Sequence, residues 1–173
     1  DSWWGHRAPL DATIGPGAAL VVDDYGDNLY ALRGGNTRGF YHHDDNTGTY
    51  GTWTQRANLP AQANAGAALV WVDDTIYATR GGDTGDFYRY DIATNTWTTL
   101  ASAADGSLFG AGASLAWDEG EYIYALIGNS SRRFQRYHIP TDQWEVLGDG
   151  SSATTDDDDT PVAVNAGGEL VYL

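Results

Sequence analysis

Short apolar segments recur along the chain, and each is followed by a polar turn and a second apolar segment. The first members of these pairs are residues 17–22, 66–71 and 112–117. The second members are residues 29–32, 76–79 and 123–126, and an acidic or Gly-containing turn separates each pair. Short apolar runs bounded by turn residues predict strands, and this spacing predicts three hairpins.

A third and a fourth segment complete each unit. The third carries aromatic residues, at 40–41, 87–90 and 134–137, and the fourth begins at Trp53, Trp97 and Trp144. The intervals between these Trp residues are 44 and 47 residues, which is the length of a four-stranded antiparallel sheet with its turns. The sequence therefore predicts an all-β chain built from repeated four-stranded sheets.

A Gly pair follows the second segment of the first two units, at 34–35 and 81–82, and the third unit has Gly128-Asn129 there. With a Tyr in the third segment and a Trp opening the fourth, the repeat resembles the Kelch family of β-propellers. The resemblance implies a propeller of four-stranded blades, in which the Gly pair permits a tight turn and the aromatic residues pack one blade against the next. Asn partly replaces the second Gly because it tolerates positive φ.

The two ends of the chain resemble pieces of one further blade. Trp4 and Leu20 are 16 residues apart, as are Trp53 and Leu69, so the N-terminus matches a fourth strand with its exit. Residues 161–165 and 170–173 match a first and a second strand. We therefore expect a four-bladed propeller whose last blade is shared by both termini and lacks a strand: an outer strand in 1–13, blades at 14–60, 61–105 and 106–150, and inner strands in 151–173.

A missing strand would leave an unpaired edge, which is a template for another chain. The segment that would form this edge carries neither charge nor Pro, and with the N-terminal aromatic residues it is the predicted self-association edge: Leu170, Val171, Tyr172, Leu173, Trp3 and Trp4. Strand addition of this kind could join copies into a filament or tube. The alternative is that the sequence is a fragment of a larger propeller protein.

The charge of this 173-residue chain disfavours two classes of binding partner. It carries 24 acidic and 9 basic residues, for a net charge of −15, and every basic residue is Arg. Such a surface repels nucleic acid and anionic membranes, and no apolar run is long enough to span a bilayer. The acidity is typical either of a high-salt habitat or of an ordinary secreted protein. Because the chain lacks Met, we expect a trimmed, secreted, extracellular protein.

Three candidate sites lie outside the strand pattern. Arg33 and Arg80, just before the Gly pairs, could bind a carboxylate or acidic sugar in a central channel, or could pair with an Asp of a neighbouring blade. The run Asp156, Asp157, Asp158, Asp159 is either a solvated acidic loop or a calcium site. Asn129 begins a glycosylation sequon.

The sequence offers no catalytic constellation. The residues His6, His42, His43 and His138 lack zinc-ligand spacing, and no nucleophile or phosphate-loop motif is present. The copper oxidases related to the Kelch family use a Cys cross-linked to Tyr, and this chain has no Cys. We expect a non-catalytic, secreted, structural protein without a cofactor that forms a homo-oligomer or polymer. A propeller that binds carbohydrate or protein is the alternative.

Overall fold

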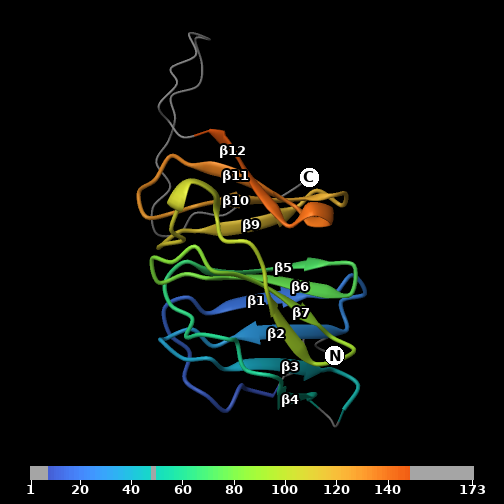
Figure 1. Cartoon of the computed structure of the whole chain (residues 1–173). Coiled ribbons are helices and arrows are strands. Elements are labelled where there is room, and N and C mark those ends of the chain that lie inside the picture. Colours follow the sequence, from blue (N-terminus) through green and yellow to red (C-terminus); the bar gives the residue numbers. More distant parts are fainter. Residues whose placement is uncertain (1–7, 48–49, 149–173) are drawn as a thin grey trace, which may run out of the picture.

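The part of the chain that the structure describes folds into three four-stranded antiparallel sheets (Figure 1). The computed structural model describes residues 8–47 and 50–148. The first sheet contains β1 (Ala19–Val22), β2 (Asn28–Leu32), β3 (Phe40–Asp44) and β4 (Thr52–Gln55). The second contains β5 (Ala67–Val72), β6 (Thr75–Arg80), β7 (Phe87–Asp91) and β8 (Thr96–Thr99). The third contains β9 (Ser114–Trp117), β10 (Tyr122–Leu126), β11 (Phe134–His138) and β12 (Gln143–Gly148).

The strands lie where the sequence pattern predicts them, and the all-β class is confirmed. Each fourth strand begins one residue before its Trp, at Thr52, Thr96 and Gln143. The repeat also fixes the register, because Leu20 pairs with Ala31, Leu69 with Ala78 and Leu115 with Ala125. The three sheets are therefore structural copies as well as sequence copies.

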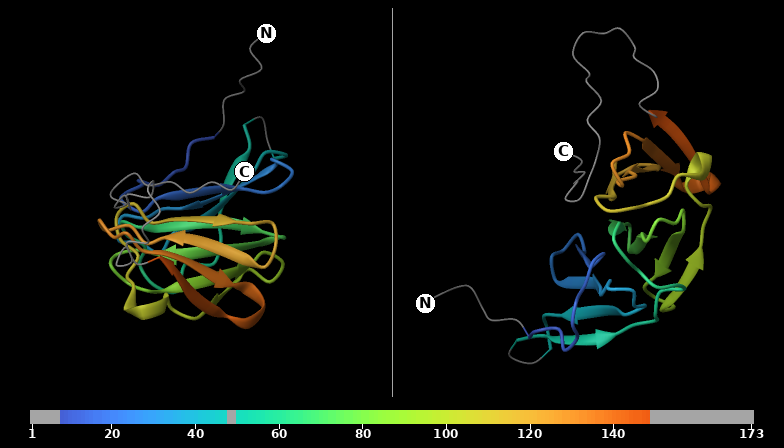
Figure 2. Two further views of the ribbon diagram at one scale, coloured as in Figure 1. Left: turned by 90° about the horizontal axis from the view of Figure 1, so that it is seen from above. Right: turned by 90° about the vertical axis from the view of Figure 1, so that its left-hand side faces the viewer.

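The sheets follow one another in a curved row, which Figure 2 shows from the side. The first strands β1, β5 and β9 lie side by side in the interior of this row. Isolated bridges join Thr37 to Ala63 and Thr84 to Phe109, so the Gly-pair end of one sheet is tied to the segment that leads into the next. Corresponding ends of successive sheets consequently face the same way.

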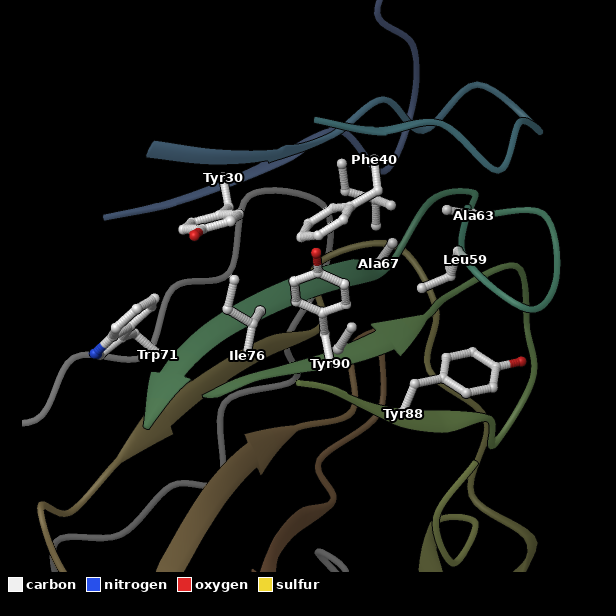
Figure 3. Packing of buried hydrophobic residues seen from close by; sticks show 11 residues of the cluster. Tyr30, Phe40, Leu59, Ala63, Ala67, Trp71, Ile76, Tyr88 and Tyr90 are labelled. Carbon is white, nitrogen blue, oxygen red and sulfur yellow. The ribbon is translucent and has the colours of Figure 1, made fainter. Parts of the chain in front are cut away.

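Two apolar cores fill the spaces between the sheets. The first contains Tyr30 and Phe40 of the first sheet with Trp71 and Tyr90 of the second (Figure 3). The second core is built in the same way from the second and third sheets. Alternation along β5 places Leu69 in the first core and its neighbours Ala68 and Val70 in the second. The middle sheet is thus apolar on both faces.

The Gly pair makes the tight turn that the sequence predicts. Gly81 has a φ of 68°, and a Cβ there would lie 2.3 Å from the backbone nitrogen of Ala67. At the second position of the pair, Gly35, Gly82 and Asn129 have φ values of 61°, 63° and 56°. Asn129 therefore replaces the second Gly with the same left-handed backbone, as expected.

Helix is almost absent from the part of the chain that the structure describes. The two helical segments there are three-residue 3₁₀ turns, η1 (Ala104–Gly106) and η2 (Ile139–Thr141). Neither has the length or the apolar character that a membrane-spanning helix requires.

Candidate functional site

One aromatic contact is used twice to join neighbouring sheets. The ring of Phe40 in the first sheet forms edge-to-face contacts with Tyr90 and Trp97 of the second, at centroid distances of 4.8 and 5.0 Å and angles of 72° and 69°. Figure 3 shows Tyr90 pointing at Phe40. The ring of Phe87 receives Tyr137 and Trp144 from the third sheet in the same way, at 4.9 and 5.0 Å and 68°. Such edge-to-face pairs add to the free energy gained by burial.

A hydrogen-bonded clamp accompanies each contact. In the second sheet the Trp97 indole N–H donates to the Ala57 carbonyl at 2.9 Å, while Asn95 Oδ1 accepts from the Tyr90 hydroxyl and from the Ala57 N–H. In the third sheet Trp144, Asp142, Tyr137 and Ala101 repeat these bonds. The clamp fixes the segment that crosses from one sheet to the next.

The first sheet also holds a segment that precedes it. The Trp53 indole N–H donates to the Ala8 carbonyl at 2.9 Å, as the later Trp residues do to Ala57 and Ala101. The rest of this clamp differs, because His43 stands at the position of Tyr90 and Tyr137. His43 is fully buried against Trp53, and its Nδ1 lies 2.9 Å from Asp45 Oδ1, outside hydrogen-bond geometry.

We call the face that a sheet turns toward its predecessor its leading face, and the opposite face its trailing face. On the leading face of the first sheet, Ile14, Leu20 and Val22 are 67%, 61% and 46% exposed. The residues at the same repeat positions are more covered in the later sheets. Ala63 and Phe109, which match Ile14, are fully buried; Leu115 and Trp71, which match Leu20 and Val22, are buried, and their other counterparts Leu69 and Trp117 are half-buried. An apolar surface that is buried or half-buried in the two later copies is therefore exposed in the first.

The trailing face of the third sheet carries the receiving half of the same contact. Tyr124 and Phe134 stack at 5.7 Å and 19°, as Tyr30 and Phe40 do at 5.9 Å and 19°. Phe40 is fully buried, whereas Phe134 and Tyr124 are half-buried. Beside them the guanidinium of Arg136 lies 4.3 Å from the centre of the Tyr122 ring.

A polar network lies on the trailing face of the first sheet. His42 Nδ1 accepts from Arg56 at 3.0 Å, and its Nε2 therefore donates to Asn28 Oδ1 at 2.8 Å. The Asn28 amide in turn donates to Asp23 at 2.6 Å. Burial, and then the positive charge of Arg56, lower the pKa of His42. The network keeps this imidazole neutral with both ring nitrogens hydrogen-bonded, which suits a structural role.

The two predicted Arg residues bind the segments that lead into their own sheets. Arg33 Nε donates to the Thr13 carbonyl at 2.6 Å, and Arg80 Nε donates to the Gln62 carbonyl at 2.9 Å. Arg80 also forms an ion pair with Asp86 at 2.8 Å. The Asp partner of Arg80 therefore belongs to its own sheet, and not to a neighbouring blade as the sequence suggested.

Asn129 is exposed, and its side-chain nitrogen donates to Asp83 Oδ1 at 3.1 Å. The predicted edge residues Leu170, Val171, Tyr172, Leu173, Trp3 and Trp4, the acidic run 156–159 and His6 lie outside the described residues. Within residues 8–47 and 50–148, no group of three or more His, Asp or Glu side chains could hold a metal ion.

The sequence did not identify the exposed leading face. Its residues belong to the repeat, and the repeat alone predicts that they are buried like their counterparts. The sequence signal that could have identified this face is its place in the repeat, because the first of several stacked sheets has no earlier sheet to cover its leading face. That signal cannot tell whether another part of the chain covers the face.

Comparison with known proteins supports the fold and leaves the family open. No model of a known protein family matches the chain, and no curated protein matches it. A solved structure of YjhT is similar, with a TM-score of 0.65 and 16% sequence identity over 84% of this chain and 54% of that one. The chain thus spans about half the length of YjhT. At this identity the likeness concerns the fold alone.

Proposed function

We propose that this chain is a non-catalytic, Kelch-like β-propeller unit with a structural function, and that it associates with further copies of itself. The observation that carries the proposal is the leading face of the first sheet, formed by Ile14, Leu20 and Val22. An apolar sheet face is normally covered by another layer. Burying a side chain of this size contributes roughly 1.5–3 kcal/mol, so a partner that covers this face gains stability.

The propeller part of the proposal is supported by what the repeated residues do. The Gly positions adopt the left-handed backbone, and the fourth-strand Trp residues pack one sheet against the previous one. These are the roles that the Kelch resemblance assigns to them. Three sheets that follow one another in a curved row, with their first strands inside, form an arrangement that further sheets could close into a ring.

The position of Ala8 supports a further blade at the start of the chain. Its bond from Trp53 matches the bonds that Ala57 and Ala101 receive from the next sheet, and each of those two residues follows a fourth strand. We therefore propose that the segment before Ala8 supplies the outer strand of an incomplete fourth blade, with residues 151–173 supplying its inner strands. Self-association through that blade would give a filament or tube.

The native mass of the purified full chain tests the proposal. Sedimentation velocity over a range of protein and salt concentrations should show species larger than the 18.6 kDa monomer, and electron microscopy should show whether they form filaments or tubes. Isolated monomers at high concentration in high salt would refute self-association. A parallel run with a chelator tests calcium at 156–159, because loss of the larger species would link the cation to assembly.

An extracellular location is part of the same proposal. Its support is the acidic, Lys-free composition, which is typical of secreted proteins as well as of proteins from a high-salt habitat. Fractionation of the producing cells, with detection by an antibody raised against the chain, provides the test. Recovery in the cytosolic fraction alone would contradict it.

Carbohydrate binding is a second candidate, favoured by two exposed aromatic residues. Tyr25 and Tyr50 are 83% and 52% exposed. They lie in the β1–β2 and β3–β4 connections, which share one end of an antiparallel sheet. Tyr rings in such positions can stack on sugars. A glycan array with the unchanged chain and with Tyr25→Ala should show hits that the variant loses, and an array without hits would count against this candidate.

A further inference from the structure

We infer that the leading face of the first sheet binds the trailing face of the third sheet of a second copy, so that the contact between copies repeats the contact within the chain. The inference rests on the proposed self-association but assigns it to surfaces other than the incomplete fourth blade: the third sheet of a second copy would take the place before the first sheet that the proposed inner strands in 151–173 would otherwise take. The contact between neighbouring sheets is made twice within the chain. At one end of the row the leading face that would make it is exposed, and at the other end the trailing face that would receive it is half-buried.

Within the chain, two later leading faces already pack on a trailing face. Leu69 and Trp71 on β5 pack on the trailing face of the first sheet, and Leu115 on β9 packs on that of the second. Leu20 and Val22 stand at the corresponding positions on β1. A surface that keeps the apolar character of these residues is suited to the same kind of receiving face.

The trailing face of the third sheet keeps the features that receive such a surface. Its Tyr124–Phe134 stack matches the stacks that Tyr30 forms with Phe40 and that Tyr77 forms with Phe87. In the repeated contact, Trp53 of one copy would meet Phe134 of the next, as Trp97 meets Phe40.

Ile14 extends the match beyond the strands. Its counterpart Ala63 donates its N–H to the Thr37 carbonyl at 2.7 Å, and its carbonyl accepts from the Asn36 N–H at 2.9 Å. Phe109 makes the equivalent bonds with Thr84 and Asp83. These residues are fully buried, whereas Ile14 is 67% exposed. A sheet placed before the first one would bury Ile14 and offer its backbone the same pairing.

A contact between two different faces has a defined consequence for assembly. Each copy offers one leading and one trailing face, so the contact is heterologous and either closes into a ring or continues as an open chain. Blocking one face leaves the other intact. Two variants blocked on opposite faces should therefore bind each other although neither binds itself.

The test uses full-length chains altered on one face only. L20R/V22R places two charges on the leading face, and Y124R places one on the trailing face. Arg lowers the negative charge of the chain, so weaker association cannot be attributed to added repulsion. Leu108→Arg, at a residue that is 47% exposed and lies between β8 and β9, is the matched control. Circular dichroism and thermal unfolding check the fold, and Phe134→Arg replaces Y124R if that variant unfolds.

The expected result is that each blocked variant associates at least about tenfold more weakly than the unchanged chain. An equimolar mixture of the two should form a species of twice the 18.6 kDa monomer mass and grow no further, while Leu108→Arg should assemble normally.

Other outcomes separate the inference from the proposed function. If the unchanged chain is monomeric at every concentration, both are wrong, and another part of the same protein covers the leading face. If both variants assemble like the unchanged chain, self-association stands but uses other surfaces. If Y124R still dimerises and L20R/V22R does not, two leading faces pair with each other, and this inference is overturned.

Discussion

A position can require glycine because its φ is positive or because a Cβ would clash, and Gly81 and Gly26 differ in this respect. Both have a positive φ, of 68° and 76°, but a Cβ on Gly81 would lie 2.3 Å from the Ala67 nitrogen, whereas a Cβ on Gly26 would meet nothing within 4 Å. We predict that Gly26→Ala lowers the free energy of unfolding by about 1 kcal/mol, through backbone strain alone. Gly81→Ala should cost at least twice as much, because the backbone must also move. Urea unfolding of both variants measures this, and equal costs would contradict it.

The buried Tyr residues predict a loss of stability in alkali. Burial raises the pKa of Tyr90 to about 12, from an ordinary value of 10.0. The folded chain therefore keeps a proton that the unfolded chain releases above pH 10, and the stability due to Tyr90 falls as the pH rises from 10 to 12. The loss should be on the order of 2 kcal/mol by pH 12.

Tyr90→Phe tests this assignment. The variant should lose about 1 kcal/mol at pH 7, because the hydroxyl no longer donates to Asn95, and it should lose less of its remaining stability in alkali than the unchanged chain. Tyr25→Phe, at a residue that is 83% exposed, should follow the unchanged chain. Urea midpoints between pH 8 and 11 provide the measurement, and parallel curves for all three chains would refute the assignment.

At the scale of single residues, the sequence predicted backbone roles better than side-chain partners. Asn129 could be assigned a positive φ because few residues tolerate one. The bond from Arg33 to Thr13 could not be predicted, because it depends on how the segment before β1 crosses the sheet. The same holds for His43, whose alignment with Tyr90 reveals the substitution but not the nearby Asp45 carboxylate.

At the scale of elements, the clamp between sheets predicts a difference between two substitutions of Asp142. This residue has a φ of 53°, and its Oδ1 accepts from both Tyr137 and Ala101. Asp142→Asn keeps the acceptor and resembles Asn95 in the second sheet, so its stability should stay within about 0.5 kcal/mol. Asp142→Gly keeps the backbone freedom but removes the acceptor, and should cost about 2 kcal/mol in urea unfolding. Similar costs for both would show that the clamp contributes little.

The strands themselves could be predicted because their signal is local. Apolar runs and turn residues lie within or next to each strand, each repeated Trp lies within its own fourth strand, and β1 to β12 lie where this pattern indicates. The exposure of Leu20 could not be predicted in the same way. It depends on which sheet, if any, lies before the first one, and periodicity within a strand carries no information about that.

At the scale of the whole molecule, acidic side chains are concentrated at one end of the sheets. The connections β1–β2, β3–β4 and their repeats, with the strand ends beside them, contain twelve acidic residues and no Arg in the described part of the chain. They are Asp23, Asp24, Asp27, Asp44, Asp45, Asp73, Asp74, Asp91, Asp118, Glu119, Glu121 and Asp142. The opposite end carries Arg33, Arg38, Arg80, Arg132 and Arg133. Repulsion within the folded chain is therefore strongest at the acidic end.

This concentration of charge predicts that salt stabilises the protein. The Debye length falls from about 30 Å at 0.01 M salt to about 3 Å at 1 M, which screens the carboxylates from one another. Added NaCl should raise the free energy of unfolding by ~1 kcal/mol or more over this range. D73N/D74N should reduce that dependence, since Asn accepts the positive φ of both positions. Asp105→Asn, near the end that carries the Arg residues, should reduce the salt dependence of stability less, for each charge removed, than D73N/D74N does. Thermal unfolding at several NaCl concentrations measures the effect, and a stability that falls as salt rises would mean that ion pairs such as Arg136–Glu145 outweigh the repulsion.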